Sequence, residues 1–300
     1  MSPFLFCSYL AGVVSLLFGL FAVRKNLSAA RGLDKVLPLG RVFTAASLAL
    51  FGAEHLAGAR FVMQVVPVWM PWRLFWTYFV GVALIAAAVS ILLLKYVRLS
   101  ATLLGIMLFL FVLLLHLPKV AANPGDRIAW AVALRDLAFA GGAWALAGAQ
   151  TGDPRGGDSH WLTTIARYCI AIPILFFAVE HFLHPEFAPG VPLAKVTPLW
   201  NPLRAAWGYL TGSVLLVSGI CLLIRMQSRM AAILLGVTMT LLVVFIYMPI
   251  WASATQPSEM TEGMNYAADT LLFAGAALLL AAALPRESIR QPHAPPLPAV

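Results

Sequence analysis

The chain has 300 residues, of which 61% are hydrophobic and only 11% are charged, and its mean hydropathy is +0.88. Soluble globular domains carry about 25% charged residues, so this composition excludes one and predicts a protein whose solvent is the lipid bilayer. The formal net charge is +8, but Lys and Arg lie in short segments between apolar runs, which is typical of topology signals and not of a nucleic-acid-binding surface.

Nine apolar stretches approach the roughly 20 residues that an α-helix needs to cross a bilayer core about 30 Å thick. They cover residues 4–23, 42–59, 74–94, 101–117, 128–146, 162–182, 205–224, 231–251 and 267–284. The first stretch has no basic residue before it and has Arg24 and Lys25 directly after it. This charge order is the reverse of that in a cleaved signal peptide, so we expect a retained helix with its N-terminus outside. The sequence therefore predicts an all-α, polytopic transmembrane bundle of about nine helices.

The basic residues gather on one side of the predicted membrane. Thirteen of the twenty Lys and Arg residues lie on that side, counting Arg167 near the start of the stretch 162–182, and one more, Arg135, lies in the middle of the stretch 128–146. The six on the opposite side are Arg60, Arg73, Lys119, Arg127, Lys195 and Arg204. Because cytoplasmic loops carry the excess of Lys and Arg, we expect a cytoplasmic C-terminus, in the inner membrane of a bacterium. The proline-rich tail is expected to be disordered.

Two halves of the chain repeat one pattern of helices. The segment WMPWRLFWTY from Trp69 corresponds to WNPLRAAWGY from Trp200, and LLGIMLFLFVLLLHLP from Leu103 corresponds to LLGVTMTLLVVFIYMP from Leu234. Both pairs are 131 residues apart and keep Trp, Arg, Tyr and Pro in register, which chance similarity between apolar helices does not explain. The last helices match as LAFAGGA and LLFAGAA.

The duplication divides the chain into five parts. They are an N-terminal helix with a basic loop (1–40), a first four-helix repeat (41–149), a linker (150–161), a second four-helix repeat (162–284) and the tail (285–300). Four is an even number of crossings, so both copies enter the membrane from the same side. A parallel duplication about a pseudo-twofold axis along the membrane normal is therefore predicted.

Each repeat carries a Glu-His pair inside a predicted helix, Glu54–His55 in the first and Glu180–His181 in the second. Each glutamate follows a basic residue by thirteen positions. At 1.5 Å of rise per residue, this spacing places the pairs about 20 Å into the bilayer, in its outer half. Ionisable groups inside a membrane are costly, so these four residues are the first candidates for a functional site.

Further polar residues are predicted near the pairs. His116 ends the third helix of the first repeat, and Tyr247 takes the matching position in the second. Asp136 and Asp269 lie in the fourth helices and are expected to complete a polar cluster within each four-helix bundle. These four residues are candidate ligand-binding residues.

Three roles remain open for the Glu-His pairs. An acid next to a base suits proton relay beside a quinone or another reducible ligand, which makes Glu54, His55, Glu180 and His181 candidate catalytic residues. Interhelical hydrogen bonding that fixes helix packing is the second role. Ligation of a metal or of haem is the third, although haem would require His55 and His181 to face each other across the axis, and we assign no metal ligands.

Trp69 and Trp200 lie in the outer, Trp- and Pro-rich segments of the two repeats. Such residues are typical of the aromatic belt at the headgroup level. Alternatively, they roof a cavity above the Glu-His pairs and bind a lipid-like substrate. The sequence contains no nucleotide-binding or hydrolase motif.

The segments FGAEHLAG at Glu54, FFAVEHFLH at Glu180 and RDLAFAGG from Arg135 resemble those of the DoxX-like membrane proteins, four-helix units with a small residue and a His near the end of their first helix. The resemblance covers about residues 41–149 and 163–284. It implies a redox-associated membrane protein, since a related subunit serves in thiosulfate-to-quinone electron transfer. This chain departs from the family in its duplication and in its added N-terminal helix.

Two functional hypotheses follow. The first is a membrane oxidoreductase subunit in which the Glu-His pairs manage protons beside a quinone. It requires a redox partner protein, because the chain has no cofactor motif of its own. The second is a non-enzymatic membrane component, either a scaffold or a carrier of a small lipophilic ligand. An open cavity that reaches the pairs favours redox or transport, and tight packing around them favours the scaffold.

Overall fold

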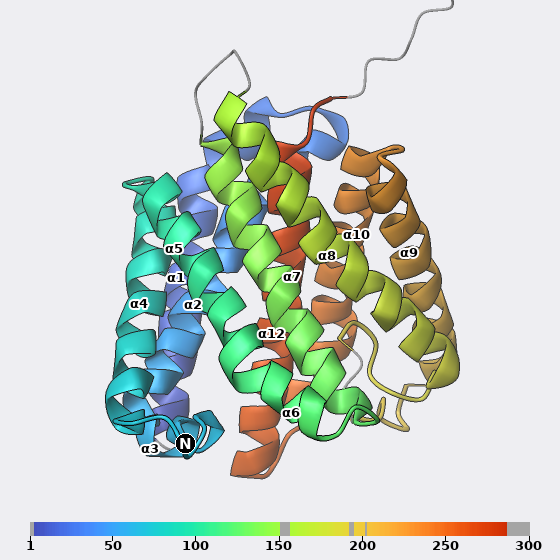
Figure 1. Cartoon of the computed structure of the whole chain (residues 1–300). Helices are drawn as coiled ribbons and strands as arrows, with labels where there is room; N and C mark the ends of the chain where they lie inside the picture. The colour runs from blue at the N-terminus through green and yellow to red at the C-terminus, as the bar shows by residue number, and fades with distance from the viewer. Residues whose placement is uncertain (1–2, 151–156, 192–194, 202, 287–300) are drawn as a thin grey trace, which may run out of the picture.

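Long helices run side by side between the two ends of a single bundle (Figure 1). The structure is a computed structural model, and the residues that it describes are 3–150, 157–191, 195–201 and 203–286. Over these residues the secondary structure is helical, with no strand beyond a single bridge between Phe187 and Val196. The predicted all-α fold is confirmed.

The long helices follow the predicted order. They are α1 (Pro3–Ala29), α2 (Leu39–Ala57), α4 (Arg73–Leu93), α5 (Val97–Phe111), α7 (Arg127–Ala149), α8 (Gly157–Leu183), α9 (Arg204–Ile224), α10 (Ser228–Leu242) and α12 (Pro257–Ala283). Shorter helices connect them: the 3-10 helices η1 (Gly32–Val36) and η2 (Met63–Val65), the π-helices η3 (Val112–His116) and η4 (Val243–Tyr247), and the single turns α3 (Ala59–Val62), α6 (Leu117–Ala122) and α11 (Met248–Ala252).

Eight helical segments are long and apolar enough to cross a membrane. The remaining predicted stretch, 128–146, forms α7, which is as long as the others but carries Arg135 and Asp136 along its course. This helix packs against α5, α8 and α12 inside the bundle, so its charges need not face lipid. Large apolar side chains such as Phe21, Val82 and Ile224 instead cover the outside. The chain is an integral membrane protein.

The two repeats share their backbone structure in register. Helices α4 and α9, α5 and α10, and the two π-helices each begin and end 131 residues apart. The turn between the second and third helices also matches, with left-handed residues at Leu94 and Tyr96 in the first repeat and at Arg225 and Gln227 in the second. The second and third helices of the two predicted repeats therefore match in their backbone, residue for residue.

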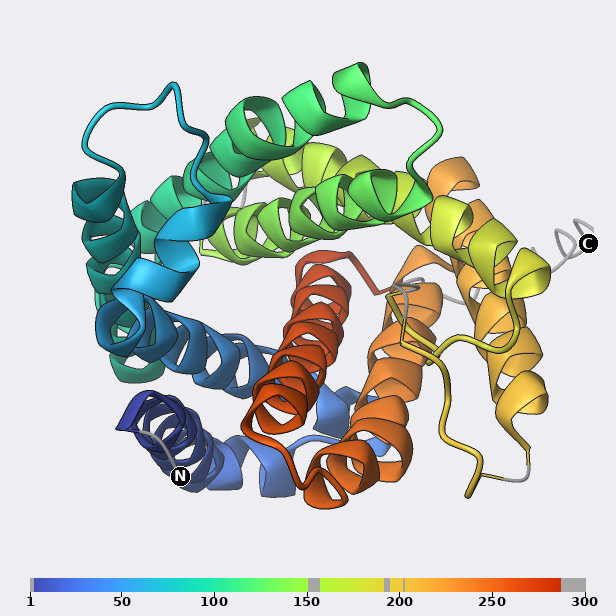
Figure 2. The same ribbon diagram turned by 90° about the horizontal axis from the view of Figure 1, so that it is seen from below.

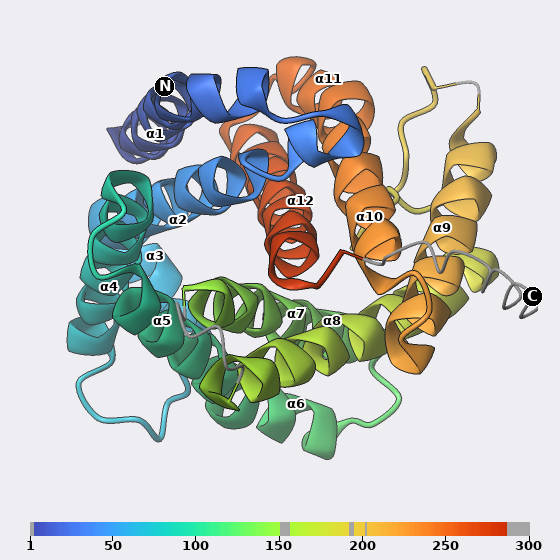
Figure 3. The same ribbon diagram turned by 90° about the horizontal axis from the view of Figure 1, so that it is seen from above.

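The helices at the centre come from both repeats (Figures 2 and 3). The fourth helices, α7 and α12, pack against each other, and each also packs against the first helix of the other repeat: α7 against α8, and α12 against α2. Small residues allow this approach. A Cβ added at Gly142 of α7 would overlap Ala276 of α12, and one added at Gly275 would overlap Thr44 of α2. The repeats are therefore not two separate bundles but one interlocked assembly.

Some predicted boundaries shift. Helix α1 continues to Ala29, past the basic pair Arg24–Lys25. Long basic side chains can keep their charged ends in the polar headgroup region while the helix extends beyond the membrane core. Helix α8 already begins at Gly157, so the predicted linker is shorter than 150–161. Residues 151–156 of that linker and residues 287–300 of the predicted tail lie outside the described residues.

Candidate functional site

A cavity of about 410 Å³ lies in the first repeat, between α2, α4, α5 and α7. Most of its lining is apolar, from side chains such as Leu48, Phe111 and Phe139. The polar and charged side chains in the lining are His55, Trp76, Thr77, His116, Arg135, Asp136 and Asp269. The sequence had singled out four of them as site residues, and the fold brings those four to one cavity. A mostly apolar cavity with a few convergent polar groups is the usual form of a small-molecule site.

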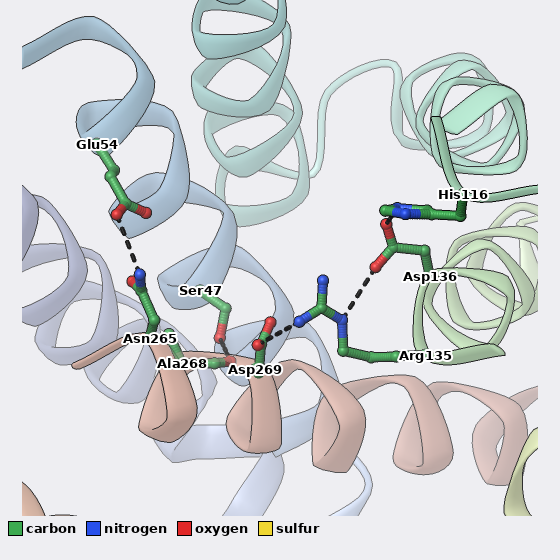
Figure 4. Close-up of polar contacts among 8 residues, drawn as sticks. All are labelled: Ser47, Glu54, His116, Arg135, Asp136, Asn265, Ala268 and Asp269. Atoms are coloured by element: carbon green, nitrogen blue, oxygen red, sulfur yellow. Dashed lines mark hydrogen bonds and ion pairs between the residues drawn. The ribbon is translucent and has the colours of Figure 1, made fainter. Parts of the chain in front are cut away.

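Arg135 is the centre of a buried polar cluster (Figure 4). Its Nε donates to Asp136 Oδ1 at 3.0 Å, and one terminal nitrogen donates to Asp269 Oδ2 at 2.7 Å. The other terminal nitrogen points away from both carboxylates (Figure 4). Asp136 Oδ2 in turn lies 2.9 Å from His116 Nε2. Both carboxylates of this cluster thus have a cationic partner, which offsets the cost of burying their charge.

This arrangement corrects the expectation of one polar cluster within each bundle. Asp136 and Asp269 belong to one shared cluster, because α7 and α12 pack against each other at the centre of the molecule. When LAFAGGA is aligned with LLFAGAA, Arg135 and Asp269 fall at equivalent positions of the two repeats, 134 residues apart. Equivalent positions close to a pseudo-twofold axis face each other, and here they carry opposite charges.

His55 lines the cavity and has one ring nitrogen without a partner. Its Nδ1 lies 2.8 Å from the carbonyl oxygen of Phe51, which accepts a hydrogen bond from Nδ1 when that nitrogen carries the proton. Nε2 is then a bare acceptor, and it has no hydrogen-bond partner among the described residues. The indole Nε1 of Trp76, a donor, is buried and also lacks a partner among the described residues. An unpaired buried polar atom is uncommon and asks for an explanation.

The two glutamates make interhelical contacts instead of pairing with the adjacent histidines. Glu54 is 5% exposed and accepts a hydrogen bond from Asn265 of α12 at 3.1 Å. Glu180 is 7% exposed and binds Arg127 of α7 at 3.0 Å. Neighbouring residues on a helix point about 100° apart, so each Glu and its His reach different partners. Each glutamate therefore joins the first helix of its own repeat to the fourth helix of the other.

The second repeat is arranged differently around His181. Its Nδ1 lies 2.6 Å from the carbonyl oxygen of Phe177, as in the first repeat, but its Nε2 accepts the backbone N–H of Gly190 at 2.9 Å. The hydroxyl of Tyr247 donates to the carbonyl oxygen of Pro189 at 2.6 Å. Both ring nitrogens of His181 are thus engaged, and neither is left to bind haem iron.

The exposed tryptophans do not reach the cavity. Trp69 is 61% exposed and Trp200 is 51% exposed, and neither lines it. Trp76 lies seven positions after Trp69, inside α4, and lines the cavity. In the sequence, Trp76 belongs to the same outer, Trp- and Pro-rich segment as Trp69, and it was not one of the predicted site residues.

A long apolar groove of about 910 Å³ lies between α4 and α5, next to the cavity. The two spaces share the lining residues Phe79, Met107 and Leu110. The groove is lined by apolar side chains such as Val82 and Leu103, which face outward toward the surroundings of the bundle. The cavity and the lipid-facing groove are therefore neighbours with a common wall.

The described residues contain no group of three or more His, Cys, Asp or Glu side chains placed to hold a metal ion. A sequence-family model described as a domain of unknown function (DUF8561) matches residues 44–138. This range runs from α2 to the middle of α7 and contains His55, Trp76, His116 and Asp136. No curated protein and no solved structure matches the chain.

Proposed function

We propose that the first repeat binds a lipophilic molecule from the bilayer, with an oxygen-bearing head group in the cavity and an apolar tail in the groove between α4 and α5. A quinone is the ligand class that fits this description best. In this proposal the chain is a quinone-associated membrane subunit that works with a redox partner protein.

One observation carries the proposal: His55 and Trp76 both line a mostly apolar cavity, and His55 Nε2 and Trp76 Nε1 lack hydrogen-bond partners among the described residues. A head group with a hydroxyl group and a second oxygen satisfies both atoms, because the hydroxyl donates to His55 Nε2 and an oxygen accepts from Trp76 Nε1. A buried polar group gains most from a ligand that pairs it, because leaving it unpaired costs about 1–3 kcal/mol. The neighbouring apolar groove offers a place for an apolar tail.

The roles of the predicted residues follow from their contacts. His55 contacts the head group and takes up or returns a proton of the ligand at Nε2. His116 and Asp136 form the polar wall beside the head group. Glu54 and Glu180 hold the two repeats together through Asn265 and Arg127 instead of relaying protons.

The likeness to DoxX-like proteins supports the same ligand class. The excess of basic residues at one end of the bundle supports a bacterial inner membrane with the N-terminus outside and the C-terminus in the cytoplasm. In Figure 1 the N-terminus and the end of α12 lie at opposite ends of the bundle, as an odd number of crossings requires.

The test is extraction of bound lipids from protein purified in a mild detergent, followed by mass spectrometry for quinones. Wild-type protein is compared with Trp76→Phe, which removes the unpaired indole donor, and with Trp207→Phe, the matched change in the second repeat. We expect quinone in the wild type and in Trp207→Phe, and about fivefold less in Trp76→Phe, since one hydrogen bond contributes about 1 kcal/mol. Absence of quinone from the wild type, or equal content in all three proteins, contradicts the proposal.

A non-enzymatic carrier of a lipophilic ligand is the second candidate. The observation that favours it is the large apolar groove next to the cavity, which suits a lipophilic ligand without any electron transfer. A ligand that is retained in the same Trp76-dependent way, but that cannot be oxidised or reduced, would favour this carrier role.

A further inference from the structure

In the second repeat, a piece of the chain itself occupies the place that the cavity holds in the first. This piece is Ala188–Val191, here named the plug segment, and all four of its residues are buried. It lies in the connection between α8 and α9, after the isolated bridge residue Phe187.

The neighbours of Gly190 correspond to residues that line the cavity of the first repeat. A Cβ on Gly190 would lie 3.6 Å from Leu242, 3.6 Å from the Tyr247 hydroxyl and 3.7 Å from Thr270. In the register of the repeats, the counterparts of these three residues are Phe111, His116 and Asp136. All three counterparts line the cavity of the first repeat, as does His55, the counterpart of His181.

One peptide group of the plug segment makes its hydrogen bonds to His181 and Tyr247. The N–H of Gly190 donates to His181 Nε2 at 2.9 Å, and the carbonyl oxygen on the other side of the same peptide, that of Pro189, accepts from Tyr247 at 2.6 Å. Gly190 has a φ of +122°, a conformation that residues with a side chain rarely adopt. The second repeat therefore uses a glycine to present a flat group with a donor on one edge and an oxygen on the other.

We infer that the first repeat holds a ligand head group with the same pattern: an N–H or O–H donor toward His55 and an oxygen atom toward His116. This inference rests on the proposed function and specifies its ligand. The contact of His55 with Phe51 matches that of His181 with Phe177, so Nε2 is an acceptor in both repeats and calls for a donor. Within the quinone class, the hydroxyl-bearing quinol is the form that fits, because the oxidised quinone has no donor.

Two pairs of probes that differ only in the donor test this inference on the full-length protein in detergent. The first pair is N-decylacetamide and decyl acetate, and the second is a decyl-benzoquinol kept reduced and its dimethyl ether. Binding is measured by isothermal titration calorimetry to wild-type protein, to His55→Phe, to His55→Gln and to the control His184→Phe. His184 lies at the end of α8, outside the cavity.

We expect the amide and the quinol to bind about tenfold more tightly than their donor-free partners, which is the effect of one hydrogen bond to a buried acceptor. The preference should vanish in His55→Phe, return in part in His55→Gln, whose side chain keeps an acceptor, and persist in His184→Phe. Because the comparison within each pair uses wild-type protein, it does not depend on the variants folding.

The other possible results overturn either this inference alone or the proposed function with it. Equal binding within both pairs, or a preference that persists in His55→Phe, overturns the inference but leaves the lipophilic site of the proposed function standing. Failure of all four probes to bind the wild-type protein overturns the proposed function, and the inference with it.

Discussion

His55 and His181 occupy equivalent positions and differ in what their second ring nitrogen meets. For His181 it accepts the N–H of Gly190, which belongs to the protein, whereas for His55, which lines the cavity, it has no partner among the described residues. The same residue type at the same position therefore has a structural role in one repeat and is free to bind a ligand in the other.

We expect His181→Phe to lower the free energy of unfolding by about 1–3 kcal/mol, because it leaves the buried N–H of Gly190 without an acceptor. The matched change His55→Phe breaks no comparable contact and should cost less. Thermal unfolding in detergent, followed by circular dichroism, measures the difference. Equal losses in the two variants would show that the plug segment does not depend on His181.

Arg135 neutralises two buried carboxylates, those of Asp136 and Asp269. We expect Arg135→Gln to destabilise the protein by about 3–5 kcal/mol, since removing one partner of a buried pair leaves an uncompensated charge. The double variant Arg135→Gln with Asp269→Asn removes one of those charges and should be more stable than Arg135→Gln alone. A thermal-unfolding double-mutant cycle compares them, and additive losses would contradict direct pairing.

Among the elements, the π-helices η3 and η4 are the feature that sequence could not predict. The predicted stretches 101–117 and 231–251 place the helices well, because apolar length is a strong signal. A π-turn has no such signal in one sequence, yet it ends at His116 in one repeat and at Tyr247 in the other. These extra residues rotate both side chains to where they meet their partners.

Deletion of Leu114 from η3 should convert the π-turn to α-helix and rotate His116 by about 100° away from Asp136. We expect loss of the bound lipophilic ligand with the protein still folded. The matched deletion of Phe245 from η4 should instead disturb the contact of Tyr247 with Pro189 and spare the ligand. Mass spectrometry of bound lipid, with circular dichroism as the folding control, separates the two. Retention of ligand after the first deletion would argue against a role for His116.

At the scale of the whole molecule, the sequence predicted the duplication and its parallel sense but not how the repeats interlock. Repeat detection depends on matched Trp, Pro and Arg positions, whereas the choice of packing partner depends on close contacts such as that between Gly142 and Ala276. For the same reason the sequence identified Asp136 and Asp269 as candidates but assigned them to separate clusters.

Because each first helix packs against the fourth helix of the other repeat, neither half should be stable alone. We expect a chain divided between residues 150 and 157 to accumulate only when both halves are expressed together. Co-purification of a tagged first half with an untagged second half measures this assembly. A first half that folds by itself would contradict the interlocked arrangement.

Photolabelling with an aryl-azide quinol analogue, followed by peptide mass spectrometry, locates the ligand in the molecule. We expect labels in α4 and α5 of the first repeat, competed by unmodified quinol and reduced in His55→Phe, with none in the matching helices α9 and α10. Labels in α9 and α10, or labels that unmodified quinol does not displace, would contradict this location.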